Sequence, residues 1–132
     1  MSSRSANVVL GMDVGASHTR AVLVDDGGQV LGVGRAGSGN WEGVGLDGAR
    51  QAYQRALDRA LADAGMERGS LAASAYGLAG LDWPSDVGRL EPVIASLGVP
   101  GPREMVNDVF LLLRAGTSDG VGLAAIAGSG TK

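Results

Sequence analysis

The stretch Gly11-Met12-Asp13-Val14-Gly15-Ala16-Ser17-His18-Thr19-Arg20 decides how the rest of the chain is interpreted. An apolar run, Val8-Val9-Leu10, leads into it, and a second apolar run begins at Ala21. This order predicts a hairpin whose tip carries backbone N–H groups, hydroxyls and the carboxylate of Asp13. Such a tip suits a metal-bound polyphosphate, because the N–H groups face phosphate oxygens and the acid faces the cation. An ordinary tight hairpin with an aspartate near its turn explains the same residues.

Composition limits the classes of protein to which the chain can belong. Its 132 residues are enough for one domain with a hydrophobic core. Hydrophobic residues make up 45% and charged residues 19%, which is typical of a globular chain rather than a disordered one. The net charge is -3 and no basic stripe is present. We therefore expect neither nucleic acid nor an anionic membrane as a partner.

The absence of cysteine excludes disulfides, thiolate catalysis and cysteine-ligated metal centres. The first residues, Met1 to Ala6, lack the apolar core of a signal peptide, and no apolar run is long enough to cross a bilayer. We therefore expect a cytoplasmic protein.

The N-terminal third predicts three strands in a meander, at Asn7–Met12, His18–Val24 and Gln29–Arg35, with a strong turn signal at residues 25–28. A glycine-rich stretch follows at residues 36–45 and is expected to be a loop. Loops of this length often bind a ligand. The alternative is a simple crossover in which Trp41 packs on the core.

Beyond that loop, helices alternate with strands, which predicts a parallel extension of the sheet. The next helix, Leu46–Ala64, has an apolar stripe and a stop at Gly65. The remaining expected elements are a strand at Ala72–Leu78, a helix capped by Ser85 and ended by Gly98, a strand at Arg103–Val106, a helix at Val109–Ala115 and a strand at Gly120–Ala127. In the second helix, Asp86 suits the first turn, and Pro92 predicts a kink or a late start. The expected fold is an α/β domain with a mixed sheet of three antiparallel and two parallel strands flanked by helices.

Three polar turns fall at expected strand ends, where α/β sheets bind ligands: residues 13–19, 107–108 and 128–131. Asp108 begins a helix, so its carboxylate stays ionised and could act as a general base, but taken by itself the residue is better explained as a helix N-cap. The turn Gly128-Ser129-Gly130-Thr131 could bind phosphate or be an ordinary glycine-serine turn. His18, the only histidine, is either a phosphate contact or a solvated turn residue.

Taken in order, five motifs resemble those of the sugar-kinase/Hsp70/actin superfamily of ATPases. They are the hairpin 11–20, Gly39-Asn40-Trp41, Tyr76-Gly77-Leu78-Ala79-Gly80, Val106-Asn107-Asp108 and Ala125-Ile126-Ala127-Gly128-Ser129-Gly130-Thr131. More narrowly, the chain is similar to the N-terminal part of N-acetylglucosamine kinases, in the group of the BadF/BadG/BcrA/BcrD ATPases. The resemblance implies a ribonuclease H-like (actin-like ATPase) fold with ATP and Mg²⁺ as cofactors.

The resemblance also implies the residues that would hold the nucleotide. Asp13 would bind Mg²⁺ through water. Two turns would face the ATP phosphates and the nucleotide, through Gly15, Ala16, Ser17, Thr19, Gly128, Ser129 and Gly130. This division suits phosphoryl transfer, which depends mainly on positioning and charge neutralisation.

By the same resemblance, Asp108 would be the base that activates the 6-hydroxyl of N-acetylglucosamine. Asn40 and Trp41 would contact the sugar, and Thr131 and Lys132 would lie near it. The kinases usually carry Asn where this chain has Lys132, which leaves the identity of the sugar open.

The resemblance divides the chain at residue 118. Residues 1–118 would form the N-terminal ATPase lobe, and residues 119–132 the first strand and phosphate turn of a second lobe. The 132-residue chain alone should then have little kinase activity. Strand 120–127 would leave an apolar edge that could pair with a second copy. The alternative is a non-catalytic domain that binds a partner or self-associates. An activator of radical dehydratases is disfavoured, because those proteins bind an iron–sulfur cluster through cysteines.

Overall fold

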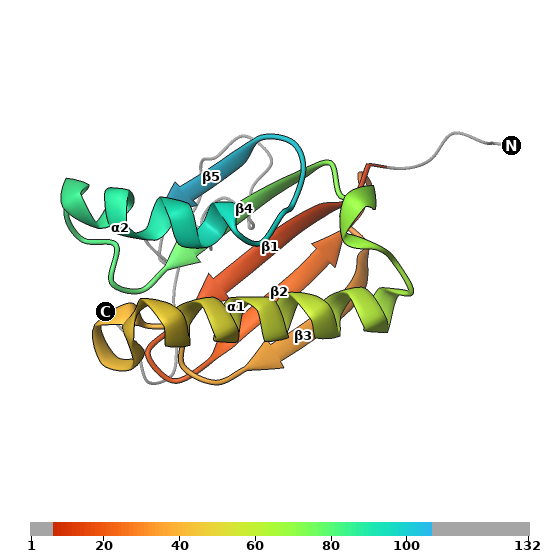
Figure 1. Ribbon diagram of the computed structural model, residues 1–132. Coiled ribbons are helices and arrows are strands. Elements are labelled where there is room, and N and C mark those ends of the chain that lie inside the picture. The colour runs from red at the N-terminus through yellow and green to blue at the C-terminus, as the bar shows by residue number, and fades with distance from the viewer. Residues whose placement is uncertain (1–6, 107–132) are drawn as a thin grey trace, which may run out of the picture.

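A computed structural model describes residues 7–106 of the chain. This part contains three strands followed by a helix, a strand, a second helix and a fifth strand, in the order that the sequence predicts (Figure 1). They are β1 (Val9–Val14), β2 (Thr19–Val24), β3 (Val30–Ala36), α1 (Trp41–Ala64), β4 (Ala73–Leu78), α2 (Pro84–Ala95) and β5 (Arg103–Val106), with a 3₁₀ turn at Arg68–Ser70 between α1 and β4. The expected helix 109–115 and strand 120–127 lie outside the described residues.

The strands form one mixed sheet in the order β3-β2-β1-β4-β5. The pairs β1–β2 and β2–β3 are antiparallel, whereas β1–β4 and β4–β5 are parallel. This arrangement confirms the predicted sheet. Its central strand is β1, so the hairpin that opens the chain also lies at the centre of the fold.

Both helices lie across the same face of the sheet, as Figure 1 shows. Alternation along β1 places Leu10, Met12 and Val14 in the core, each at most 1% exposed, while Asp13 is exposed on the other face. The helices complete this core with Tyr53 and Leu57 from α1 and with a matching set from α2 and the residues after it: Leu90, Val93, Ile94 and Leu97. Burial of these apolar side chains is the main force that holds the layers together.

Helix α1 approaches β3 closely because β3 offers glycines on the covered face. A Cβ atom at Gly34 would lie 2.1 Å from the carbonyl oxygen of Ala56, and one at Gly32 would lie 2.4 Å from that of Ala60. Alanines on α1 meet these glycines, so backbone packs almost directly on backbone.

Three predicted boundaries are wrong. Strand β1 continues to Val14, so Asp13 belongs to the strand and not to the turn. The segment 41–44 is the first turn of α1 instead of a loop, and Gly45 (φ 80°, ψ 168°) separates it from the rest of the helix. Helix α2 begins at Pro84, so Ser85 lies inside its first turn and does not cap it.

Pro92 was expected to kink or delay α2, but the helix starts early and runs past this residue to Ala95. Pro92 therefore lies in the last turn. Within residues 7–106, neither helix is both long enough and apolar enough to cross a membrane.

Candidate functional site

The candidate site lies at one edge of the sheet, where β1 turns into β2 and where β4 ends. The N–H of Gly15 donates a hydrogen bond of 2.8 Å to the carbonyl oxygen of His18 and closes the hairpin. Ala16, Ser17 and His18 are exposed at its tip. The predicted phosphate-binding backbone is thus accessible at a tight, small-residue turn.

Asp13 is exposed on the sheet face opposite the helices. In the sheet register, it lies between Arg20 on β2 and Gly77 on β4. Within residues 7–106, no group of three or more acidic, histidine or cysteine side chains could hold a metal ion. One exposed carboxylate fits a Mg²⁺ ion that keeps most of its water and takes its other ligands from phosphate.

Two buried hydroxyl groups hold the loop before α1, one from the hairpin and one from α1 itself. The Thr19 side chain is fully buried and donates a hydrogen bond of 2.9 Å to the carbonyl oxygen of Gly37. The Tyr53 hydroxyl, on α1, donates one of 3.2 Å to the carbonyl oxygen of Gly39, and burial raises the pKa of Tyr53 well above its usual range. The Thr19 hydroxyl therefore has a structural role, and contact of this residue with a nucleotide stays a prediction.

Gly39 is required for this close approach. A Cβ atom there would lie 2.6 Å from the Thr19 hydroxyl oxygen and 2.8 Å from side-chain atoms of Val14 and Tyr53. The loop consequently lies against the end of β1, and it delivers Asn40 to the same edge of the sheet.

Asn40 caps α1, because its side-chain oxygen accepts a hydrogen bond of 3.1 Å from the N–H of Glu42. Trp41 is partly buried against the core, and its indole N–H donates a hydrogen bond of 3.1 Å to the carbonyl oxygen of Gly80. Gly80 has φ +90°, and a Cβ atom there would lie within 2.9 Å of both Asn40 and Trp41. The end of β4 therefore packs directly on the two residues that were predicted to contact a sugar.

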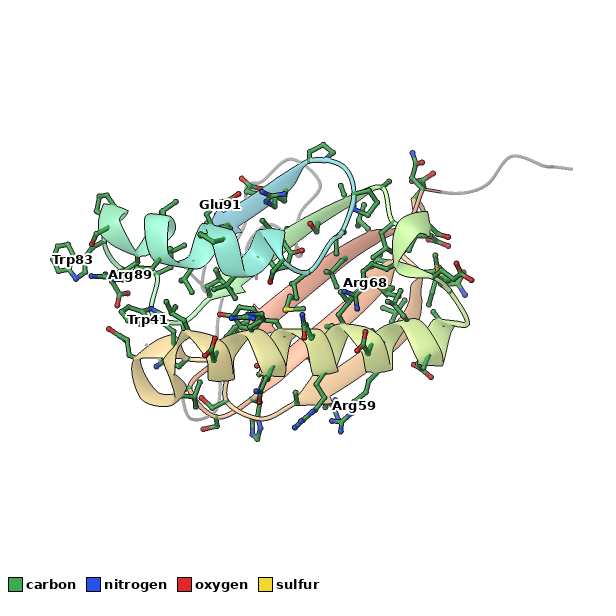
Figure 2. All side chains as sticks on the ribbon, in the orientation of Figure 1. Trp41, Arg59, Arg68, Trp83, Arg89 and Glu91 are labelled. Atoms are coloured by element: carbon green, nitrogen blue, oxygen red, sulfur yellow. The ribbon has the colours of Figure 1, made fainter. Side chains whose placement is uncertain are left out.

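Helix α2 contributes two charged residues that the sequence did not single out as parts of the site. The guanidinium carbon of Arg89 lies 5.2 Å from the ring centre of Trp41, and its Nη1 lies 3.0 Å from a carboxylate oxygen of Asp86. Figure 2 shows Arg89 next to Trp41, with Trp83 at the outer end. The sequence indicated the Asp86–Arg89 pair only through the spacing of three residues, which is typical of ion pairs on a helix, and it did not indicate the contact with Trp41.

The structure thus gathers only part of the predicted site. Asp13, Gly15, Ala16, Ser17 and Thr19 lie in or beside the hairpin, and Asn40 and Trp41 lie on the loop tied to it. The other predicted residues lie outside the described residues: Asp108, Gly128, Ser129, Gly130, Thr131 and Lys132. Their predicted roles stay predictions.

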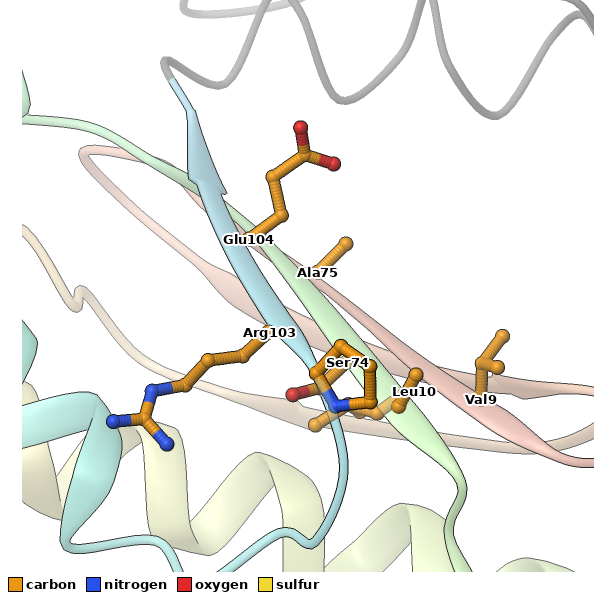
Figure 3. A pocket seen from close by; sticks show the side chains of 8 residues that line it. Val9, Leu10, Ser74, Ala75, Arg103 and Glu104 are labelled. Atoms are coloured by element: carbon orange, nitrogen blue, oxygen red, sulfur yellow. The ribbon is translucent and has the colours of Figure 1, made fainter.

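A groove of about 300 Å³ lies at the opposite end of the sheet, at the first residues of β1, β4 and β5 (Figure 3). Figure 3 shows Glu104 and Ala75 on the face opposite the helices and Arg103 on the side of the helices. None of the predicted site residues lines this groove.

Solved structures share the fold. A candidate N-acetylglucosamine kinase from Chromobacterium violaceum matches over 86% of this chain, with a TM-score of 0.64 and 22% identity. YeaZ from Pseudomonas aeruginosa matches over 83%, with a TM-score of 0.51 and 18% identity. The chain spans only 40% and 48%, respectively, of these two proteins. Identities this low show the fold alone, and they confirm the expected actin-like ATPase architecture.

No curated protein matches the sequence. The profile of the BadF/BadG/BcrA/BcrD ATPase family, however, matches residues 10–132, which is nearly the whole chain. The matched range begins in β1 and includes the hairpin, the loop before α1 and both helices. The chain therefore belongs to the BadF/BadG/BcrA/BcrD ATPase family.

Proposed function

We propose that this chain is the N-terminal lobe of an enzyme that transfers phosphate from ATP to a sugar hydroxyl, the 6-hydroxyl of N-acetylglucosamine. One observation carries the proposal: the hydrogen bond from Thr19 to Gly37 ties the loop that ends in Asn40 to the hairpin that carries Asp13. A candidate phosphate-binding turn and a candidate sugar-binding turn are thus held at one edge of the sheet. Membership of an ATPase family supports nucleotide use.

In this proposal the hairpin binds the nucleotide. The backbone N–H groups of Ala16 and Ser17 are on an exposed turn that the Gly15–His18 hydrogen bond keeps closed. Asp13 would hold Mg²⁺ through water, and the ion would neutralise phosphate charge when bound. That hydrogen bond closes the turn without a bound nucleotide, so little ordering of the turn is needed on binding.

Asn40 and Trp41 would contact the sugar. The cap uses the side-chain oxygen of Asn40, so its amide N–H₂ group can still donate to a sugar hydroxyl. The indole edge of Trp41 is fixed on Gly80, which makes this residue a wall of the pocket. Asp108 would accept the proton of the 6-hydroxyl, with Thr131 and Lys132 nearby and Ser129 at the nucleotide. A cytoplasmic location belongs to the same proposal.

Steady-state kinetics of the protein at its full natural length would test these assignments. Asn40→Ala should raise KM for the sugar and leave KM for ATP unchanged, whereas Asp13→Asn should raise the Mg²⁺ concentration that is needed for half-maximal rate. Asp47→Asn, an exposed change one turn into the helix, is the control. Equal effects of Asn40→Ala on both substrates would contradict the sugar assignment.

The 132-residue chain should have little kinase activity alone, since it spans 40% of the length of the Chromobacterium violaceum protein. Robust phosphorylation of N-acetylglucosamine by this chain would contradict that expectation. Pairing of two copies through residues 120–127 stays a prediction, and sedimentation as a monomer at high concentration would contradict it.

A further inference from the structure

The first turn of α1, residues 41–44, is set apart from the helix that follows by a break in the helical backbone. Gly45 has a non-helical backbone (φ 80°, ψ 168°) and separates this turn from the rest of α1. Glu42, Gly43 and Val44 are exposed, so Trp41 is the one residue of the turn that packs on the rest of the described structure. The loop before Asn40 is held by the hydrogen bonds of Thr19 and Tyr53, and the turn that Asn40 caps is held by Trp41, so a loosened Trp41 would disturb the cap from that side.

Two contacts anchor Trp41. Its indole N–H donates to the carbonyl oxygen of Gly80, which fixes the edge of the ring. The guanidinium of Arg89 lies over the ring at 5.2 Å, a distance at which the cation is attracted to the π face. The first contact fixes the position of the ring and the second restrains its tilt.

Arg89 is itself held by an ion pair with Asp86, one turn earlier on α2. Its ion-pair partner Asp86 is only 3% exposed, and a second carboxylate oxygen accepts hydrogen bonds of 3.0 and 2.9 Å from the N–H groups of Asp82 and Trp83. These donors, the nearest being that of Trp83, hold the pKa of Asp86 below its usual range. The carboxylate is therefore a rigid, charged support for the guanidinium.

We propose that Arg89 is a positioning residue for sugar binding, which acts by locking Trp41 and with it the Asn40 cap. The inference rests on the proposed function, because it takes Asn40 as a sugar contact. The side chain of Arg89 is 49% exposed, and its nearly buried partner Asp86 keeps the hydrogen bonds from Asp82 and Trp83 when Arg89 is replaced. Its loss should therefore affect the sugar site more than the stability of the fold.

The test uses Arg89→Met and Arg89→Lys in the protein at its full natural length. Arg55→Met is the matched control, since Arg55 is an exposed arginine on α1 away from the turn. Loss of an exposed cation–π contact corresponds to about a two- to fivefold rise in KM for the sugar in Arg89→Met, with KM for ATP and kcat unchanged. Arg89→Lys keeps the cation and should recover part of this loss, and Arg55→Met should have no effect.

A spectroscopic readout makes the test independent of turnover. The chain has two tryptophans, so Trp83→Phe leaves Trp41 as the single emitter. In that background, Arg89→Met should shift the emission of Trp41 to longer wavelength, and Arg55→Met should not. An unshifted emission spectrum would overturn the anchoring role.

The outcomes separate the two proposals. If Asn40→Ala raises KM for the sugar and Arg89→Met does not, the positioning role is wrong and the proposed function stands. If neither Asn40→Ala nor Arg89→Met changes KM for the sugar, the sugar site itself is wrongly assigned. A fall in kcat of Arg89→Met with an unchanged KM would also overturn the positioning role.

Discussion

Replacing Gly34 by alanine should destabilise the protein by about 3 kcal/mol, as expected for overpacking at a site that cannot relax. The new Cβ atom would lie 2.1 Å from the Ala56 carbonyl oxygen and 2.4 Å from the Ala60 nitrogen. Ordinary contact for a Cβ atom begins at 3.4 Å, so α1 would have to retreat by about 1.3 Å (3.4 − 2.1). Both obstructing atoms belong to the helix backbone, and no side-chain rotation can relieve the clash.

Urea unfolding followed by far-UV circular dichroism measures this change in the free energy of unfolding. Gly11→Ala in β1 is the control, because a Cβ atom at Gly11 would have no neighbour within 4 Å. The control should change stability by no more than about 0.5 kcal/mol. A loss below about 1 kcal/mol for Gly34→Ala, with an unchanged m value, would refute the close packing of α1 on β3.

Three further predictions concern the site. Gly80→Ala should lower the free energy of unfolding in urea by about 1–2 kcal/mol more than Gly28→Ala. Both glycines have positive φ, but of the two only Gly80 would place a Cβ atom within 4 Å of other atoms. Equal losses would contradict the contact with Trp41. Thr19→Val should lower the free energy of unfolding by about 1–2 kcal/mol, measured by thermal denaturation, because the carbonyl of Gly37 loses its buried donor. An unchanged stability would refute the hydrogen bond between the loop and the hairpin. The pKa of Asp86 is lowered in the folded state from its ordinary value of 3.8, so the carboxylate stabilises the fold above that pH and loses this effect as pH falls through the folded-state pKa. The difference in urea midpoint between wild type and Asp86→Asn should therefore shrink at acid pH. A difference that does not change with pH would contradict this.

The sheet could be predicted from the sequence because its strands are short apolar runs bounded by turn residues. The run Val8-Val9-Leu10, the small-residue turn after it and the glycines at residues 27–28 predict a meander, and helices between the later strands favour parallel pairing. The glycines of β3 were less informative, because only the position of α1 shows that they permit close packing.

The start of α1 could not be predicted in the same way. The segment 41–45 contains two glycines and is typical of a loop. A helical turn forms because Asn40 supplies a cap and Trp41 is anchored on the turn that follows β4. That anchor is a tertiary contact between residues 39 positions apart. The contact of Arg89 with Trp41 could not be predicted for the same reason, because the two residues lie on different helices and are far apart in the sequence.

The family and the fold were recognised from motifs in a fixed order, each of which is weak alone. Three of these motifs lie wholly within the described residues, namely the hairpin, residues 39–41 and residues 76–80, and they meet at one edge of the sheet. The assignments of Asp108 and of the turn 128–131 depend on contacts beyond Val106.

The most direct test of the central claim is to identify the product formed from ATP and N-acetylglucosamine by the protein at its full natural length, using ³¹P nuclear magnetic resonance. The account predicts a sugar phosphorylated at the 6-hydroxyl. It also predicts that Asp108→Asn lowers turnover by several orders of magnitude, on the order of 10³-fold or more, without preventing folding. Hydrolysis of ATP to inorganic phosphate without any phosphorylated amino sugar would contradict the account.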